Sequence, residues 1–282
     1  MSGTRAFGVS TQLYHNFRLS RQHLLEIGAH GFEAVELFAT RTHFDFHNPA
    51  AVADLQQWLT EAALELHGVH APVAESFTNG RWGEMLSLAS ADADARMHAL
   101  GEAEAALYVA RRLPFNVLVV HLGLPRTQAG PGDNSRDGAR RSIEQLQKKA
   151  WPLGVRIAVE VIPNELSRAE SLVHFVEDVV ETADVGICLD FGHAHMDGDL
   201  IDAIETVSEH LFATHVHDNR GRQDDHLVPF EGTIDWAGAL TAIQKVGFEG
   251  TLLLEIGGRG AARETLQRAR KARERMEKLL AH

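Results

Sequence analysis

Residues 185–193 read VGICLDFGH, a continuous apolar run that ends in an aspartate and is followed three residues later by a histidine. A short run rich in Val, Ile and Leu, without polar alternation, is typical of a strand covered on both faces of a parallel sheet. A carboxylate in such a place is costly to bury unless it is paired or binds a metal. The segment therefore predicts a buried parallel strand whose carboxyl end carries chemistry.

The same arrangement recurs along the chain. Eight short apolar runs stand at residues 7–13, 34–39, 66–71, 117–123, 156–162, 185–191, 211–217 and 251–257. Helical patterns, several with Ser, Asp or Asn at the start, separate or follow them at residues 20–30, 49–64, 94–113, 133–150, 167–182, 199–209, 235–246 and 261–280. This alternation predicts an α/β fold, a (β/α)₈ TIM barrel in which residues 1–282 form a single domain. An open doubly wound sheet is the alternative, but no glycine-rich phosphate loop follows the first run.

The composition limits the classes of protein to which this chain can belong. The length of 282 residues is close to the roughly 250 that one such barrel needs. The net charge of −12 argues against nucleic acid as a partner and suits a site that collects divalent cations. The single cysteine, Cys188, lies in an apolar run, which fits a reducing compartment. No apolar leader or membrane-length stretch is present, so we expect a cytoplasmic protein without a membrane partner.

Side chains that bind metals stand at or just beyond the ends of most runs. Carboxylate and imidazole are the ligands that hold Zn²⁺, Mn²⁺ or Mg²⁺. In a parallel barrel the carboxyl ends of all strands meet at one mouth, so these donors are predicted to surround a shared cation. The candidates are His70, His121, Glu160, Asp190, His193, His215, Asp224, His226 and Glu255.

Two glutamates carry the most weight, because Glu160 and Glu255 are the acids within otherwise apolar runs. A structural pairing with a neighbouring Arg or Lys is the alternative to a role in metal binding or catalysis. His215 and His217 are two residues apart, so a strand directs both to the same side. One is expected to be a ligand and the other a substrate contact.

Weaker candidates lie near the first two runs. Glu36 is expected either to orient a ligand or to pair with Arg41, and His15 follows the first run. The polar, glycine-containing stretch 126–134 is predicted to be a loop over the active face.

Taken together, these segments resemble the xylose-isomerase-like barrel superfamily, which contains sugar-phosphate isomerases and epimerases and the endonuclease IV group. The resemblance covers nearly the whole chain, through GFEAVELF, GVHAP, VVHLG, AVEV, CLDFGHAH and LLLEI. It is most specific at residues 214–236, where H-x-H-D-N is followed by D-x-H-L and then E-G-x-I-D-W.

The resemblance implies two ligand sets. In ketose epimerases of this superfamily one divalent metal is held by four groups, which match Glu160, Asp190, His215 and Glu255, and the two glutamates act as acid and base. In the endonuclease IV group a larger set holds three zinc ions, and its additional members match His70, His121, His193, Asp224 and His226. This chain keeps both sets.

The resulting hypothesis is a divalent-metal-dependent isomerase or epimerase of a small sugar or sugar derivative. The reaction would pass through a metal-bound enediolate, with Glu160 and Glu255 as the catalytic pair and His193 and His217 as substrate contacts. Zinc or manganese is the expected ion, with magnesium or cobalt as further options, and a homo-oligomer is compatible with the sequence. The alternatives are a trinuclear-zinc phosphodiesterase acting on abasic DNA, an enolate-forming lyase or dehydratase, and a non-catalytic metal-binding relative.

Overall fold

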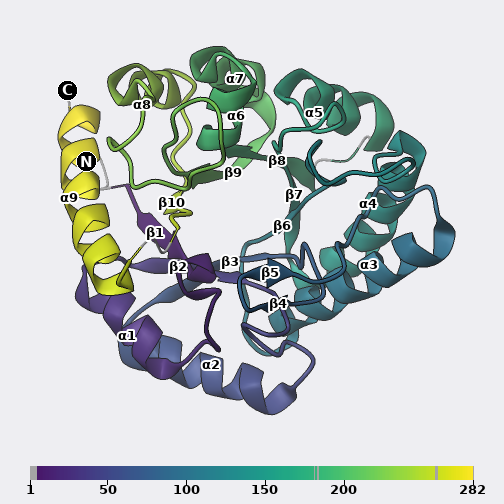
Figure 1. Ribbon diagram of the computed structural model, residues 1–282, viewed down its shortest axis with the longest axis horizontal. Coiled ribbons are helices and arrows are strands. Elements are labelled where there is room, and N and C mark those ends of the chain that lie inside the picture. Colours follow the sequence, from purple (N-terminus) through teal and green to yellow (C-terminus); the bar gives the residue numbers. More distant parts are fainter. Residues whose placement is uncertain (1–4, 181, 183, 258–259, 282) are drawn as a thin grey trace.

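Eight parallel strands close into a barrel in the computed structural model, which describes residues 5–180, 182, 184–257 and 260–281 (Figure 1). Neighbouring strands around the barrel follow the order β1, β10, β9, β8, β7, β6, β3, β2. Their bounds are β1 Phe7–Ser10, β2 Ala34–Phe38, β3 Glu65–His70, β6 Val117–Val120, β7 Arg156–Glu160, β8 Val185–Asp190, β9 Leu211–Val216 and β10 Leu252–Leu254. The predicted (β/α)₈ barrel is confirmed, and each of the eight apolar runs supplies one strand.

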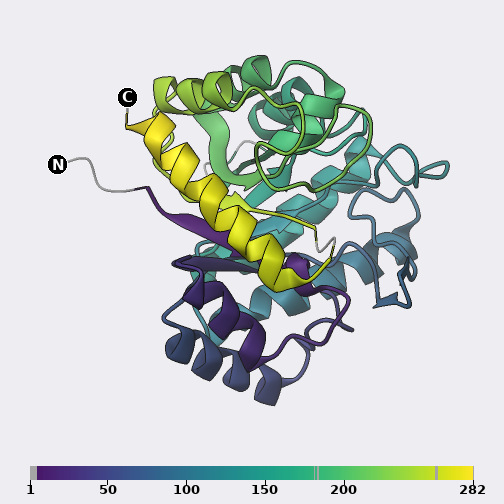
Figure 2. The same cartoon turned by 60° about the vertical axis from the view of Figure 1, so that its left-hand side comes forward.

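Helices surround the barrel, as Figures 1 and 2 show, with the C-terminal helix lying across its outside. Those that match the predicted segments are α1 Arg21–Ala29, α2 Pro49–Ala62, α3 Ala93–Leu107, α4 Arg136–Ala150, α5 Ala169–Phe175, α7 Leu200–Thr206, α8 Trp236–Lys245 and α9 Ala262–Leu280. α9 buries Leu266 and Met276 and exposes its charged residues. No helix among these described ranges is long and apolar enough to cross a membrane.

Three predicted helices end earlier than expected. Segment 199–209 is α-helical only to Thr206 and is followed by a 3-10 helix, Ser208–His210. The α-helical part of segment 94–113 ends at Leu107 and continues as a 3-10 helix, Tyr108–Arg111. Segment 167–182 is α-helical only to Phe175 and then forms a π-helical turn, Val176–Val180. Three valines lie in that turn, and β-branched residues lose rotamer freedom in an α-helix, so the regular helix is weak there.

Two further elements were not predicted. A short helix, α6 Phe191–Asp197, begins directly after β8 because Oδ1 of Asp190 accepts a hydrogen bond from the backbone N of His193, at 2.7 Å. His195 lies on this helix. Strands β4 Phe77–Thr78 and β5 Arg81–Trp82 form a hairpin. Its turn residues, Asn79 and Gly80, both have positive φ, as the Asn-Gly hairpin signal requires.

Alternation along the strands places an apolar layer beneath the mouth of the barrel. That layer consists of Val117, Val119, Ala158, Cys188 and Ala213. Since every second residue of a strand faces the same side, the next inward positions along these strands are His121, Glu160, Asp190 and His215. The barrel interior is thus filled by hydrocarbon up to the level at which the ionisable side chains begin.

Candidate metal centre

The four side chains expected to hold one ion meet at the carboxyl ends of adjacent strands. Glu160, Asp190, His215 and Glu255 each offer one donor atom, and these atoms all lie within 4.8 Å of one another. Nδ1 of His215 is 3.1 Å from Oε1 of Glu160 and 3.6 Å from Oε2 of Glu255. All four side chains are buried. The structure therefore brings together groups that lie up to 95 positions apart in the chain, and their metal-binding role stays a prediction.

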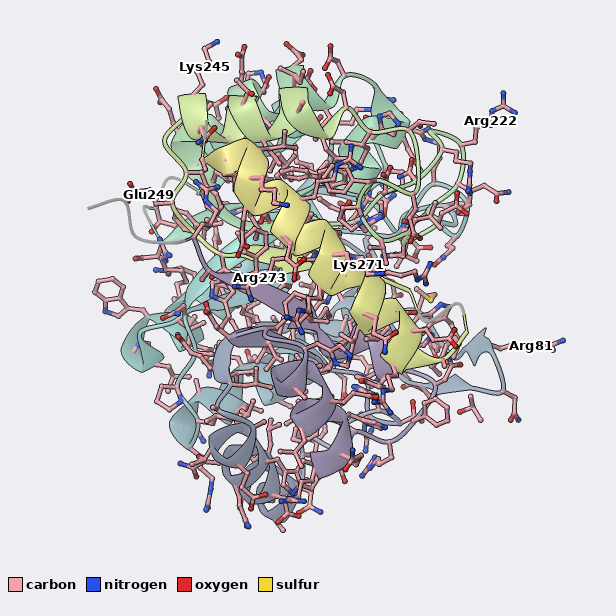
Figure 3. The ribbon with its side chains drawn as sticks, turned by 90° about the vertical axis from the view of Figure 1, so that its left-hand side faces the viewer. Arg81, Arg222, Lys245, Glu249, Lys271 and Arg273 are labelled. Carbon is pink, nitrogen blue, oxygen red and sulfur yellow. The ribbon has the colours of Figure 1, made fainter. Side chains whose placement is uncertain are left out.

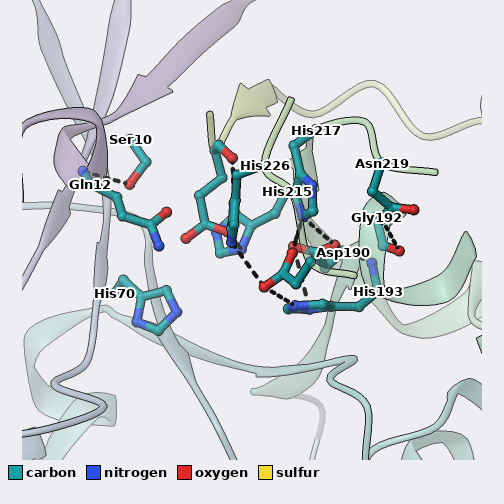
Figure 4. Close-up of polar contacts among 12 residues, drawn as sticks. Ser10, Gln12, His70, Asp190, Gly192, His193, His215, His217, Asn219 and His226 are labelled. Atoms are coloured by element: carbon teal, nitrogen blue, oxygen red, sulfur yellow. Dashed lines mark hydrogen bonds and ion pairs between the residues drawn. The ribbon is translucent and has the colours of Figure 1, made fainter. Parts of the chain in front are cut away.

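The other predicted donors extend this cluster on both sides. Nε2 of His70 and Nε2 of His121 lie 3.0 and 3.1 Å from the same oxygen of Glu160. On the opposite side, Nε2 of His217 lies 3.1 Å from Oδ2 of Asp190 (Figure 4). The sequence treated His217 as a substrate contact, but its ring is fully buried among the donors.

The D-x-H pair closes the cluster from the loop after β9. Oδ2 of Asp224 lies 3.2 Å from Nε2 of His193 and 3.0 Å from Nε2 of His226. His217, Asp224 and His226 form a second group whose donor atoms could share an ion, and Asp190, His193 and His217 form a third. All nine predicted ligands therefore belong to one continuous set of contacts.

Hydrogen bonds to the backbone fix the orientation of three of the rings. The Nδ1 atoms of His70, His193 and His226 lie 2.8 to 3.0 Å from the carbonyl oxygens of Ala71, Val161 and Glu255, respectively. A carbonyl oxygen can only accept, so each Nδ1 donates its proton to the backbone and each Nε2 is directed toward the carboxylates, to which its own proton is donated when the ring is charged. Metal-binding histidines are usually held in this way.

Glu36 orients the fourth ring. Its Oε2 lies 3.1 Å from Nε2 of His215, which leaves Nδ1 directed toward Glu160 and Glu255. The alternative pairing of Glu36 with Arg41 is not seen, because Arg41 lies beside Glu102. The expectation that Glu36 orients a ligand agrees with this geometry.

The charges of the cluster fit a divalent cation. Five carboxylates meet here, Glu36 included, and within the described parts of the chain their ion-pair partners are histidines and not Lys or Arg. Burial alone would lower the pKa of His70, but Glu160 raises that pKa to about 9. Burial alone would raise the pKa of Glu160, but His215 and His121 hold it well below its usual range. A bound cation would supply the positive charge that the imidazoles otherwise provide, and a mixed nitrogen and oxygen donor set suits zinc or manganese.

A cavity of about 290 Å³ opens above the donors. His193 lines it, as expected of a substrate contact, and so does Gln128 of the predicted loop 126–134. Residues that the sequence did not single out form much of the remaining wall: Gln12, Phe38, Val73, Met85 and Pro125, together with Trp82 of the β4–β5 hairpin. The Asn79-Gly80 turn is the one sequence signal that could have placed Trp82 there.

Gly192 has no room for a side chain, because a Cβ at this position would collide with the ring of His217. We expect Gly192→Ala to displace His217 from Asp190 and to weaken zinc binding by about 10–100-fold, the usual effect of disturbing a ligand's support. Competition with a chromogenic chelator measures this affinity. Gly101→Ala on exposed helix α3, where a Cβ meets nothing within 4 Å, is the matched control. Equal zinc affinity in the two variants would show that this ring is not part of the metal centre.

Asp218 holds the loop that carries the D-x-H pair. This buried carboxylate accepts five hydrogen bonds at 2.9 to 3.2 Å, from the backbone N of Asn219, Phe230, Gly232 and Ile234 and from Nε1 of Trp236.

We expect Asp218→Ala to lower the free energy of unfolding by about 3–5 kcal/mol, because it leaves several buried donors without an acceptor. Urea denaturation measures the loss. Asp54→Ala on the exposed face of α2 should change stability by less than about 0.5 kcal/mol. A loss at Asp218 no larger than that at Asp54 would contradict the role of this carboxylate.

Comparison with known proteins finds relatives and solved structures that are similar to this chain. An uncharacterized protein of Methanocaldococcus jannaschii is 26% identical over 257 residues, which cover 88% of this chain and 83% of that protein. The crystal structure of a D-tagatose 3-epimerase-like protein is 25% identical with a TM-score of 0.79 and covers 98% of this chain and 97% of that one. The structure of the IOLI protein with a zinc atom shares the fold at 17% identity, with a TM-score of 0.76, over 96% of this chain and 98% of that one. The family model for the xylose isomerase-like TIM barrel matches residues 24–281, and the chain belongs to that family.

Proposed function

We propose that this protein is a divalent-metal-dependent isomerase or epimerase of a sugar or sugar derivative. The observation that carries the proposal is the meeting of Glu160, Asp190, His215 and Glu255 in one group, of which the two glutamates line a small cavity. The similarity to a D-tagatose 3-epimerase-like protein supports the reaction class, and the zinc atom of the IOLI structure supports a divalent ion.

Glu160, Asp190, His215 and Glu255 would hold the ion, which when bound acts as a Lewis acid on a carbonyl group and fixes its orientation. Glu160 and Glu255 both line the cavity, with one oxygen of each within 4.8 Å of the other. One carboxylate takes the proton from the carbon beside the substrate carbonyl. The other glutamate, which starts as the carboxylic acid, gives its proton to the opposite face of that carbon in an epimerisation. In an isomerisation it gives the proton to the neighbouring carbon, and the hydroxyl proton passes to the former carbonyl oxygen. Positioned acid and base groups of this kind contribute roughly 10²–10⁴-fold to the rate.

His193 is the predicted substrate contact that the cavity supports. Its ring lines the cavity, and its Nδ1 position is fixed by the carbonyl of Val161. The ring can therefore reach a substrate hydroxyl while its backbone is held by the cap at Asp190. This role is part of the proposal.

Phosphodiester hydrolysis is the second candidate, because the overlapping donor groups could hold more than one ion. The charge around the site argues against a nucleic-acid substrate. Arg81 and Arg222 project away from the molecule into solvent, as Figure 3 shows, and no Lys or Arg is among the described residues that line the cavity. Phosphate backbones need such cations.

Isotope exchange tests the proposed function. The metal-loaded protein is incubated in D₂O with free ketoses, D-tagatose among them, and with keto derivatives of cyclic polyols. We expect deuterium to appear at the carbon beside the carbonyl, followed by a second isomer, in proton NMR spectra. Absence of exchange across the whole panel, together with cleavage of an abasic-site DNA duplex by the same sample, would overturn the proposal in favour of the second candidate.

A further inference from the structure

Gln12 presents a side chain to the cavity on a fixed backbone. It lies in the 3-10 helix Thr11–Tyr14 that follows β1. Its backbone N donates to Oγ of Ser10 at 3.3 Å, and its carbonyl accepts from the backbone N and Nδ1 of His15 at 2.9 and 2.7 Å. The main chain is thus tied on both sides, while Figure 4 shows the carboxamide directed toward the donor cluster.

The carboxamide of Gln12 has an unused acceptor. Its Oε1 is buried and has no hydrogen-bond partner, although the residue lines the cavity. Leaving a buried polar group unpaired costs about 1–3 kcal/mol. A hydroxyl group of a ligand in the cavity can donate to this oxygen and remove that cost.

The rest of the lining disfavours a charged substrate group. Within the described residues the wall contains three carboxylates, Glu160, Asp224 and Glu255, and neither Lys nor Arg. Five histidines also line it, and four of them are already paired with Glu160 or Asp224: His70, His121, His193 and His226. Arg126, on the neighbouring loop, is engaged by Glu165 at 3.0 Å. A phosphate monoester would therefore face like charges and find no free cationic side chain among these residues.

Part of the cavity wall is apolar. Phe38, Val73, Trp82 and Met85 line it, and the ring of Trp82 lies 6.1 Å from that of Phe38 and 4.6 Å from that of Phe77. An apolar wall with a few placed polar groups is typical of a site for a small neutral molecule. It suits the C–H face of a sugar or a carbocyclic polyol.

From these observations we propose that Gln12 is a specificity-determining residue that binds a hydroxyl of a neutral, unphosphorylated hydroxy-ketone. This inference rests on the proposed function and names its substrate class. The apolar wall takes the C–H face of that substrate, and the carboxylates exclude its phosphate esters.

Two measurements test the inference. Isotope exchange gives kcat and KM for free ketohexoses and for their 6-phosphates. Calorimetry gives the Kd of the matching hexitols, which lack the carbonyl and cannot react. In Gln12→Leu, we expect KM and the hexitol Kd to rise about tenfold, equivalent to one lost hydrogen bond, with kcat nearly unchanged. The unfolding midpoint and metal content should equal those of the wild type. Gln22→Leu on the exposed face of α1 is the control and should leave both constants unchanged.

The 6-phosphates should bind at least about tenfold more weakly than the free sugars, since the described lining places carboxylates and no Lys or Arg beside their added charge. Tighter binding of the phosphates, or unchanged KM and Kd in Gln12→Leu, would overturn the inference. Wild-type protein that binds hexitols in a Gln12-dependent way but exchanges no proton would support this inference and count against the proposed reaction alone. Proton exchange that is unchanged in Gln12→Leu would support the proposed reaction and count against this inference.

Discussion

Replacing Glu160 or Glu255 by glutamine is expected to lower kcat for interconversion by about 10²–10⁴-fold or more while the barrel stays folded. Glutamine keeps the shape of the side chain but cannot take a proton from carbon. Both residues line the cavity and are buried, with carboxylate oxygens 3.1 and 3.6 Å from Nδ1 of His215. The rate of isomer formation, followed by NMR at saturating metal, measures the loss.

The two variants should also differ from each other in a way that a structural defect would not produce. If Glu160 and Glu255 serve opposite faces of the substrate, each variant keeps one of the two bases. It should still exchange deuterium into the isomer whose proton faces the remaining glutamate, but it should not convert that isomer into the other one. Glu165→Gln, at a side chain 73% exposed, is the control and should behave as the wild type. Activity like that of the wild type in either site variant would remove that glutamate from the mechanism.

Metal removal is expected to have the second large effect. After gentle purification we expect about one tightly bound ion per chain, and dialysis against a chelator should abolish proton exchange. A ligand that binds only the folded state at a hundred times its Kd adds about 2.7 kcal/mol of stability. The thermal unfolding midpoint should therefore fall by several degrees and recover with zinc or manganese more than with magnesium.

Two variants decide where that ion binds. His215→Ala should lose the ion, because this ring contacts two of the three carboxylates of the candidate centre, Glu160 and Glu255. His210→Ala alters an exposed group with Glu177 and Glu209 that could also hold an ion, and it should leave the metal content unchanged. Loss of the ion in His210→Ala, with the ion retained in His215→Ala, would show that the ion binds at the surface group of Glu177, Glu209 and His210. Three zinc ions per chain, with phosphodiesterase activity, would favour the second candidate function.

The sequence pattern was sufficient to predict the barrel and to select the candidate metal donors, whose role stays a prediction. Strand β8 is a short run of apolar residues that ends in an aspartate, and the two-residue period of a strand places Cys188 and Asp190 on the same inward side. Since parallel strands place all carboxyl ends at one mouth, donors distant in sequence could be assigned to one site without coordinates. These signals depend only on residues close together in the chain, so they can be read from the sequence.

Only the tertiary structure decided how those donors are used. Which nitrogen of His215 faces the carboxylates depends on Glu36, 179 positions away, and the burial of His217 depends on the absence of a side chain at Gly192. The cavity wall likewise comes from Gln12 and Trp82, which no local pattern marks as neighbours. These features depend on packing between segments whose relative positions are fixed by the closed barrel, and no periodicity within one segment encodes them.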